Sequence, residues 1–336
     1  MIPDLDFLDR VSVLIVGDIM LDRYLWGDIR RISPEAPVPV VEVDRETHTA
    51  GGAANVASNL VALGVRCELF GVVGNDGGGG ELQALLRARN VIFDPQLARA
   101  GTPTITKTRI VAQRQQVCRL DRESNFASYS IAETGLLELL AGKAAQYDAV
   151  IISDYAKGVI TQPVVDTLRR VRARKGNLLA FDPKPSRPLD LDGMDLLTPN
   201  RGEAIQLAGL VAPGREGPEL NEIAEQVLAR HHPECLVITL GEQGMLLRTR
   251  QGVIRHFPTV VRQVADVSGA GDTVIATLTA ALAGGLSPEQ AVDVANIAAG
   301  IVVGKLGTAT VTREEIVRGL IAEASSSGQK NRPSSG

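Results

Sequence analysis

Short runs of aliphatic and β-branched residues recur along the chain, separated by stretches in which apolar residues follow a helical spacing. The first run, residues 11–16, ends in Gly17-Asp18, as expected of a buried parallel strand. Further strands are predicted at 67–73, 149–152, 178–181, 196–197 and 235–239, and helices at 80–89, 162–175 and 220–230. This alternation predicts an α/β fold with a doubly wound, mostly parallel sheet flanked by helices.

Two stretches interrupt the alternation. Residues 37–43 look extended after a proline-bearing loop, and residues 105–120 alternate apolar and polar positions around a polar centre at 113–116. The second pattern predicts a β-hairpin, and an ordinary surface hairpin is the simplest alternative. We assign residues 1–324 to one globular domain. The small, polar residues 325–336 are expected to form a disordered tail.

The amino-acid composition argues against several classes of function. With 336 residues, 44% hydrophobic and 22% charged, the chain is typical of a globular protein, and a net charge of -4 gives no signal for nucleic acid or membrane binding. The three cysteines have no paired spacing, which argues against a disulfide framework or zinc site and favours a cytoplasmic location. No run approaches the roughly 20 apolar residues of a membrane span.

The most informative segment is residues 266–274. A small-residue turn, Gly269-Ala270-Gly271, directly precedes Asp272 at the start of an apolar helical stretch. Free N–H groups and the positive end of a helix dipole form an anion site there, and glycine lets the backbone approach a ligand. A carboxylate beside that site is placed to accept a proton from an attacking hydroxyl. The structural alternative is a glycine turn capped by aspartate.

A second glycine pair lies far away in the sequence. Gly51-Gly52 precedes apolar residues at 53, 56, 57, 60 and 63, which is helical spacing, and Asn55 falls in the first turn. Together the two motifs resemble the paired signatures of the PfkB (ribokinase-like) carbohydrate kinases. The resemblance implies a ribokinase-like fold with a small β lid, and it implies roles for both motifs. By this resemblance the sugar would be bound by Gly51, Gly52 and Asn55. The anion hole would be formed by Gly269, Ala270 and Gly271, and the catalytic base would be Asp272.

The same resemblance implies further site residues. Asp18 would bind sugar hydroxyls, unless it only caps a turn. The Asn200-x-x-Glu203 element would position phosphate oxygens and a hydrated Mg²⁺, with Glu203 acting through water, since Mg²⁺ keeps several of its waters. Asn296 would lie near the adenine, with a hydrogen-bonded core amide as its alternative. The remaining ATP-binding positions would be Thr239, Gly241 and Gly244.

A wider resemblance covers roughly residues 10–320. The stretches GDIMLDRYLWGDIRRISPEAPVPVVEV, SDYAKGVIT, DPK, LLTPNRGEA and VVGKLGTATV are similar to the kinase half of bacterial heptose-phosphate kinase/adenylyltransferases. This implies ATP-dependent phosphorylation of O1 of D-glycero-β-D-manno-heptose 7-phosphate, giving the 1,7-bisphosphate for lipopolysaccharide-core heptose. It also implies lid segments near 33–46 and 105–121 that cover the sugar and carry a homodimer contact. Because no nucleotidyltransferase domain follows, we expect the stand-alone form of the kinase.

A phosphorylated sugar requires cations, and ligands of such sheets gather beyond the carboxyl ends of the strands. Asp154 and Lys157 follow one predicted strand, and Lys184 follows another. We assign Asp154, Lys157 and Lys184 to the substrate, together with Arg109 or Arg114 of the lid. For each lysine the alternative is an ordinary solvated side chain.

Other functions stay open at this point. The chain is expected to be either the heptose kinase or another PfkB sugar kinase of the fructokinase or ribokinase type. A catalytically silent sugar- or nucleotide-binding protein is a third possibility, which retention of Asp272, Asn200 and Glu203 disfavours. A dinucleotide-binding oxidoreductase is excluded, because no GxGxxG follows the first strand.

Overall fold

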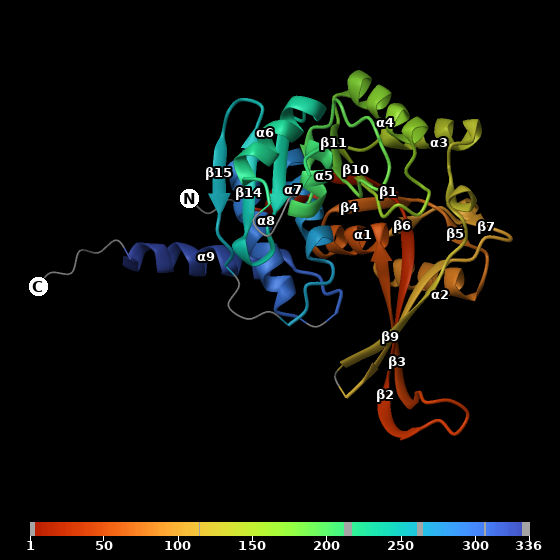
Figure 1. Cartoon of the computed structure of the whole chain (residues 1–336). Coiled ribbons are helices and arrows are strands. Elements are labelled where there is room, and N and C mark those ends of the chain that lie inside the picture. The colour runs from red at the N-terminus through yellow and green to blue at the C-terminus, as the bar shows by residue number, and fades with distance from the viewer. Residues whose placement is uncertain (1–3, 114, 212–216, 261–264, 306, 331–336) are drawn as a thin grey trace, which may run out of the picture.

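A nine-stranded, mostly parallel sheet forms the centre of the molecule (Figure 1). The computed structural model describes residues 4–113, 115–211, 217–260, 265–305 and 307–330. For residues 326–330 it describes the backbone alone. The strand order is β15-β14-β13-β12-β11-β10-β1-β4-β6, parallel except for β14 and β15. The strands are β1 (Ser12–Gly17), β4 (Arg66–Phe70), β6 (Ile92–Phe93), β10 (Ala149–Ser153), β11 (Leu178–Asp182), β12 (Leu196–Leu197), β13 (Cys235–Thr239), β14 (Met245–Thr249) and β15 (Ile254–Phe257).

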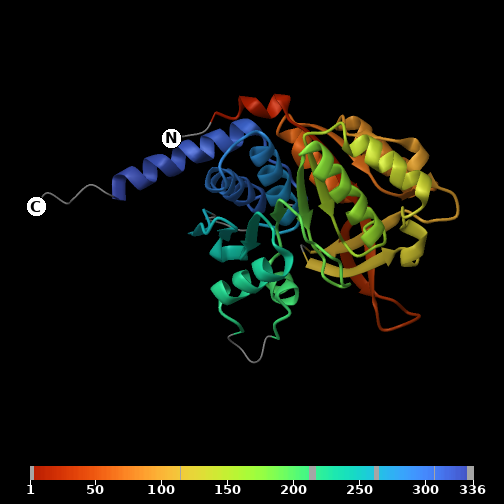
Figure 2. The ribbon, with the colours of Figure 1, turned by 90° about the horizontal axis from the view of Figure 1, so that it is seen from above.

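Helices cover both faces of this sheet. One layer contains α1 (Ala53–Ala62), α2 (Gly77–Ala88), α7 (Ala270–Ala283), α8 (Pro288–Val303) and α9 (Arg313–Lys330). The other contains α3 (Thr134–Ala144), α4 (Gln162–Lys175), α5 (Arg201–Ala208) and α6 (Leu220–His231). Figure 2 shows the blue C-terminal helices on one side of the strands and the green and yellow helices on the other.

Strand β1 shows why both layers are needed. Val13 and Ile15 pack into the first layer, Leu14 and Val16 pack into the second, and all four side chains are fully buried. Successive strand residues point to opposite faces, so a strand that is apolar throughout must be covered on both. Burying each of these side chains contributes about 1.5–3 kcal/mol. The predicted doubly wound fold is confirmed.

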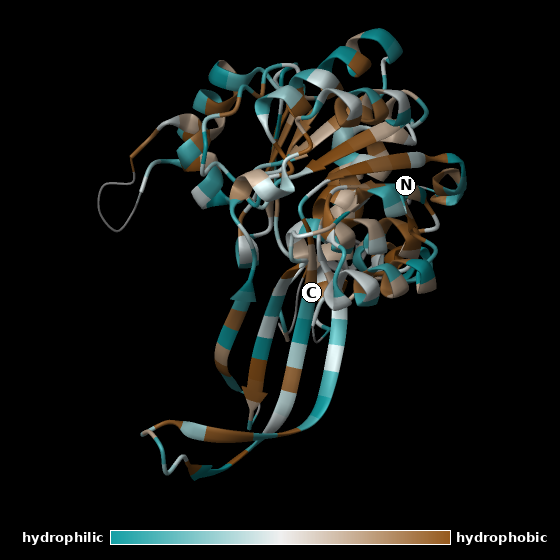
Figure 3. Cartoon of the chain, turned by 90° about the vertical axis from the view of Figure 1, so that its right-hand side faces the viewer, coloured by the Kyte–Doolittle hydropathy of each residue, from teal (hydrophilic) through white to brown (hydrophobic). Residues whose placement is uncertain are grey.

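The second sheet is a four-stranded lid that projects from the body (Figures 1 and 3). Its order is β3-β2-β8-β9, and the strands are β2 (Ile19–Ile32), β3 (Pro39–Gly52), β8 (Ile105–Ala112) and β9 (Gln115–Arg122). The hairpin predicted within 105–120 is therefore present as β8 and β9. Strand β2 was missed, because charged residues interrupt its apolar positions and its pairing with β3 and β8 is a tertiary event.

Several element boundaries differ from the sequence prediction, and two of these differences are informative. Helix α2 begins at Gly77 rather than at residue 80, because the Asp76 carboxylate accepts a hydrogen bond from the Gly79 N–H (2.9 Å). Disorder from Ser325 onward was wrong for 325–330, since α9 continues to Lys330. A helix that has started adds a hydrogen bond with each further residue, so small polar residues can extend it. The rest of the predicted tail, 331–336, lies outside the described residues. Within the described part of the chain, no helix has the length and apolar character to cross a membrane.

Candidate active site

The N-terminus of α7 holds the carboxylate of Asp272, which is 6% exposed. Gly269 precedes the helix with a φ of 80°, a left-handed conformation that favours glycine. A Cβ at this position would also lie 2.7 Å from Nδ2 of Asn55. The turn therefore needs glycine for its backbone and for the close approach of a second helix.

That second helix is α1, which begins directly after Gly51 and Gly52. Its Asn55 side chain donates from Nδ2 to Oδ2 of Asp272 at 2.7 Å, across 217 residues of sequence. One turn further on, Thr273 donates from Oγ1 to Oδ1 of Asn59 at 2.9 Å. The two glycine motifs thus meet as a pair of helix N-termini joined by buried side-chain hydrogen bonds.

Tyr155 is one of the residues at this site that the sequence analysis missed. Its hydroxyl donates to Oδ1 of Asp272 at 2.5 Å, so both oxygens of the carboxylate have a donor. Tyr155 follows Asp154 at the carboxyl end of β10, and that position was the one available signal. Burial and the nearby Asp272 raise the pKa of Tyr155 well above its ordinary value, so the phenol remains a donor.

The electrostatics of Asp272 suit a general base. Burial raises the pKa of its carboxyl to about 6, although the hydrogen bonds from Tyr155 and Asn55 act in the opposite direction. The charge of Asp22 raises this pKa further, and that of Lys107 lowers it. A base is most effective when its pKa lies near the working pH, and this environment moves Asp272 toward that range.

Asp18 does not present its carboxylate to a ligand, which corrects the sequence analysis. The side chain is fully buried, and Oδ2 accepts hydrogen bonds from the backbone N–H groups of Tyr155 (2.9 Å) and Lys157 (3.0 Å). Oδ1 accepts from the N–H of Val159 at 3.0 Å. A carboxylate at the end of β1 satisfies the buried amides of the loop after β10, so Asp18 fixes the position of Tyr155.

Asp22, on β2, is the acidic residue that faces the site. It is 6% exposed, and its Oδ1 pairs with Arg109 of β8 at 2.5 Å. A Cβ on Gly51 would lie 2.0 Å from Asp22 Oδ2, so glycine at 51 leaves room for this carboxylate. The spacing Gly17-Asp18-x-x-x-Asp22 offered two aspartates, and only the path of β2 distinguishes them.

Two adjoining cavities lie beyond the strand ends. The smaller, about 190 Å³, is lined by the predicted residues Asp154, Lys184, Asn200, Glu203, Thr239, Gly269, Gly271 and Asp272, and by Tyr155, Asp182, Pro183 and Thr198. The larger, about 670 Å³, is lined by the predicted residues Thr239, Gly241, Gly244, Ala270, Gly271 and Asn296, and by Glu242, Met245, Thr259, Val267, Val274, Ala299, Gly300 and Val303. Thr239 and Gly271 belong to both, so the cavities share a border.

The polar residues of these cavities also have structural roles. Asn200 and Glu203 form a capping box at the start of α5, in which each backbone N–H donates to the other's side chain at 2.9 and 3.0 Å. Glu203 also accepts from Lys184 Nζ at 3.0 Å. Asn296 donates from Nδ2 to the Pro258 carbonyl at 2.8 Å, so its amide is satisfied while it lines the larger cavity.

Carboxylates crowd the smaller cavity. Burial, Asp272 and Glu203 together raise the pKa of Asp182 well above its ordinary value. Burial and the neighbouring Asp18 raise the pKa of Asp154 to about 6, and Asp154 Oδ2 is buried without a hydrogen-bond partner. Oxygen donors under mutual repulsion are the set that Mg²⁺ prefers, so these residues fit a hydrated Mg²⁺.

The predicted cations already have carboxylate partners. Lys157 Nζ lies 2.6 Å from Glu123 Oε2, Lys184 pairs with Glu203, and Arg109 pairs with Asp22. Arg114 lies outside the described residues. Lys184 lines the smaller cavity, and each of these three cations is already paired with a carboxylate.

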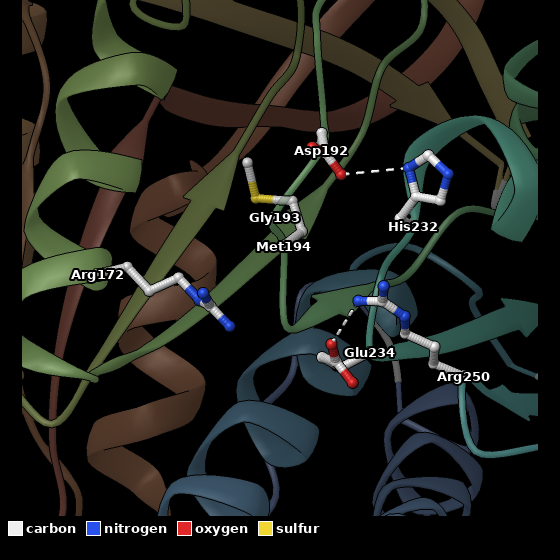
Figure 4. A pocket seen from close by; sticks show the side chains of 7 residues that line it. All are labelled: Arg172, Asp192, Gly193, Met194, His232, Glu234 and Arg250. Atoms are coloured by element: carbon white, nitrogen blue, oxygen red, sulfur yellow. Dashed lines mark hydrogen bonds and ion pairs between the residues drawn. The ribbon is translucent and has the colours of Figure 1, made fainter.

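A further cavity of about 390 Å³ lies elsewhere (Figure 4). Its residues Asp192 and Met194 precede β12, and His232 and Glu234 precede β13, so it sits at the amino ends of these parallel strands. His232 Nδ1 lies 3.3 Å from Asp192, and Arg250 lies 2.9 Å from Glu234. Two ion pairs thus use four of its charged side chains, Arg172 pairs with Asp195 outside the lining, and the cavity lies opposite the end where the two glycine motifs meet.

Comparison with known proteins defines the class. Residues 11–315 match the model of the pfkB family of carbohydrate kinases. The chain belongs to this family, and it is a phosphotransferase that uses an alcohol group of a sugar as acceptor.

Two relatives of similar sequence are both named bifunctional protein HldE. The chain is 42% identical over 307 residues to the bifunctional protein HldE of Citrifermentans bemidjiense, covering 91% of this chain and 63% of the relative. It is 44% identical to HldE of Halorhodospira halophila, covering 99% and 69%. The chain thus spans about two thirds of the length of these relatives.

Solved structures support the fold. Arabidopsis thaliana ribokinase complexed with ribose and ATP has a TM-score of 0.72 at 20% identity, covering 92% of this chain and 98% of the ribokinase. Phosphofructokinase-2 of Escherichia coli in complex with potassium has a TM-score of 0.74 at 16% identity, covering 94% and 99%. The ribokinase-like fold is therefore confirmed.

Tyr155→Phe should move the acid limb of the pH profile of kcat/KM to higher pH by about one to two units. The hydroxyl stabilises the ionised carboxylate of Asp272, and a hydrogen bond to a charged group is worth about 1.5–3 kcal/mol. Activity requires the deprotonated base, so it is lost as pH falls through the pKa of Asp272, and the variant should lose it earlier.

Tyr147→Phe is the matched control, because its hydroxyl also donates to a carboxylate, Glu68 Oε2 at 2.6 Å, away from the site. Rate profiles of sugar phosphorylation from pH 5 to 9 make the comparison. An unshifted acid limb in Tyr155→Phe would show that Tyr155 does not set the protonation of the base.

Proposed function

We propose that this chain phosphorylates O1 of D-glycero-β-D-manno-heptose 7-phosphate with ATP, giving the 1,7-bisphosphate used for ADP-heptose and lipopolysaccharide-core synthesis. The observation that carries the kinase chemistry is the buried Asp272 carboxylate at the N-terminus of α7, held between Asn55 and Tyr155. The choice of sugar is supported by the sequence resemblance over residues 10–320 and by the HldE relatives.

In the proposed mechanism Asp272 accepts the O1 proton at Oδ1, which Tyr155 now contacts. Backbone N–H groups of Ala270 and Gly271, at the positive end of α7, stabilise the charge that develops on the transferred phosphoryl group. The helix fixes its dipole and these amides before the reaction, so they need little reorganisation during it; at present the Ala270 N–H donates to the Val267 carbonyl at 3.3 Å. Proton acceptance and charge stabilisation thus come from a single helix turn.

The two cavities supply places for the nucleotide. We assign the larger one to adenosine, because Val267, Val274 and Val303 give it an apolar lining next to the amide of Asn296. The smaller one, between Glu203 and Asp272, would receive the phosphates. Mg²⁺, held through water by Glu203 and Asn200, would neutralise charge on the β and γ phosphates.

For the sugar we propose Asp22 in place of Asp18. Asp22 has a carboxylate oxygen next to Gly51, and its partner Arg109 comes from the lid strand β8. Asn55 lies between these groups and Asp272. A polyol there would meet a carboxylate, an amide and a guanidinium, the donors and acceptors that hydroxyl groups require.

Another PfkB sugar kinase, of the fructokinase or ribokinase type, is the alternative within the family. ADP release with heptose 7-phosphate, fructose, ribose and fructose 6-phosphate separates them, and the highest kcat/KM is expected for heptose 7-phosphate. A silent binding protein would release ADP with none of these sugars. We also propose a cytoplasmic location, since ATP is found there and the three cysteines form no disulfide.

Asp272→Asn should lower kcat by about 10² to 10⁴. The amide keeps an oxygen that can accept from Tyr155 or Asn55, so the helix start should survive, but it cannot take up the hydroxyl proton. Kinetics with heptose 7-phosphate, thermal melting and ATP binding by calorimetry measure the three effects. Asp293→Asn, on the surface of α8, serves as the control for loss of a carboxylate. Near-native turnover of Asp272→Asn with native melting would remove Asp272 as the base.

We further propose a homodimer through the lid, which exposes large apolar side chains: Ile32, Val38, Val43 and Leu120 are 51–62% exposed. Leu120→Lys should shift the chain toward monomer in light scattering at micromolar concentration, because the charge would have to be desolvated in the interface. Ile254→Lys changes an equally exposed residue on β15 and should leave the mass unchanged. A dimer that persists in Leu120→Lys, or a wild-type monomer, would contradict the lid contact.

A further inference from the structure

Lys107, on the lid strand β8, is a cation to which the proposed mechanism assigns no role. Its β2 partner is Asp22, and it lies two residues before Arg109 on β8. Paired residues and residues two apart share a face of a sheet, so Lys107 lies on the same lid face as the Asp22–Arg109 pair. Its Nζ lies 5.9 Å from the centre of the Tyr155 ring, and its charge lowers the pKa of Asp272.

Lys107 differs from its cationic neighbours in lacking a counter-ion. Lys157 lies 2.6 Å from Glu123, and Arg119 lies 2.8 Å from Asp121. Within the described ranges of the chain, Lys107 has no hydrogen bond or ion pair, although Asp22 and Asp121 lie opposite it on the neighbouring strands, and its Nζ lies over the Tyr155 ring. Cations near protein interiors are normally paired, so this arrangement suits a site that receives an anion from outside.

The environment of the ammonium supports the same conclusion. Lys107 is half-buried, and desolvation lowers its pKa, with Lys157 and Arg119 adding repulsion against the partial compensation of Asp22 and Asp121. An anion bound between Lys107 and Lys157 would relieve both the desolvation and the repulsion. A sugar phosphate dianion has the charge and the oxygen acceptors to do so.

We propose that Lys107 binds the distal phosphate of the acceptor sugar and thereby selects phosphorylated sugars over free ones. The inference rests on the proposed function and deepens it. Several acidic residues surround the site, among them Asp22, Asp154 and Asp272, and their charges repel a phosphorylated acceptor. Lys107 offsets that repulsion from the lid, where its Nζ lies over the ring of Tyr155. A free sugar gains nothing from this cation, so the effect is one of specificity.

Lys107→Met tests this directly, because methionine keeps most of the apolar stem and removes the ammonium group with its charge and its hydrogen-bond donors. The value of kcat/KM for heptose 7-phosphate should fall about 10- to 100-fold, as expected for loss of a charge-assisted hydrogen bond. The value for unphosphorylated heptose should fall less, because the free sugar loses only the effect of this charge on the pKa of Asp272, and the KM for ATP should change by less than about threefold. Lys107→Arg should restore most of the loss, since arginine keeps the charge. Lys175→Met, an exposed lysine at the end of α4, should match the wild type.

The deciding quantity is the ratio of kcat/KM for the phosphorylated sugar to that for the free sugar. A ratio unchanged in Lys107→Met would overturn the role of Lys107, even if both rates fell. Wild-type turnover of heptose 7-phosphate tests the proposed function separately. If the wild type does not turn over this sugar, calorimetric affinities without ATP replace the rates. Equal wild-type affinity for phosphorylated and free heptose, or a preference that survives in Lys107→Met, would likewise overturn the inference.

Discussion

The hydrogen bond from Asn55 to Asp272 is the contact on which the site depends. It joins the N-termini of α1 and α7, two helices that start after glycine turns and pack against each other in one layer. Both positive helix ends thereby point at one region, and the Asn59–Thr273 bond fixes their register one turn deeper. Gly269 is required because a side chain there would separate the helices. Two helix N-termini can bind one anion together only if both are held in place, and these buried hydrogen bonds hold them.

The cost of this arrangement is a concentration of buried carboxylates. Burial raises the pKa values of Asp154, Asp182 and Asp272, so each is less stable as an anion in the fold than in water. Burial raises the pKa of Asp18 as well, and hydrogen bonds from three backbone N–H groups of the loop after β10 offset part of this effect. That loop carries Tyr155 to Asp272. The carboxylate of Asp18 thus positions Tyr155, whose hydroxyl donates to Asp272, the proposed base. The remaining acidic groups are available for cations and hydroxyls.

Much of this was determined by the sequence itself. Apolar runs predicted the strands β1, β10, β11 and β13 nearly to the residue, because a strand buried on both faces has no other composition. The glycine motifs predicted both helix starts, since conformations and close approaches without a Cβ are local requirements. The resemblance to the kinase family implied site roles for Asn200, Glu203 and Thr239, and the structure places all three in the lining of the smaller cavity.

Tertiary structure alone decided the rest. Nothing local distinguishes Asp18 from Asp22, and only the course of β2 into the lid turns one to the backbone and the other to the site. Tyr155 and Lys107 come from a loop and a lid strand that meet only in the folded chain. The unpaired state of Lys107 depends on which carboxylates its neighbours take. Local patterns specify elements because they reflect backbone geometry, whereas the roles of charged side chains depend on partners distant in sequence.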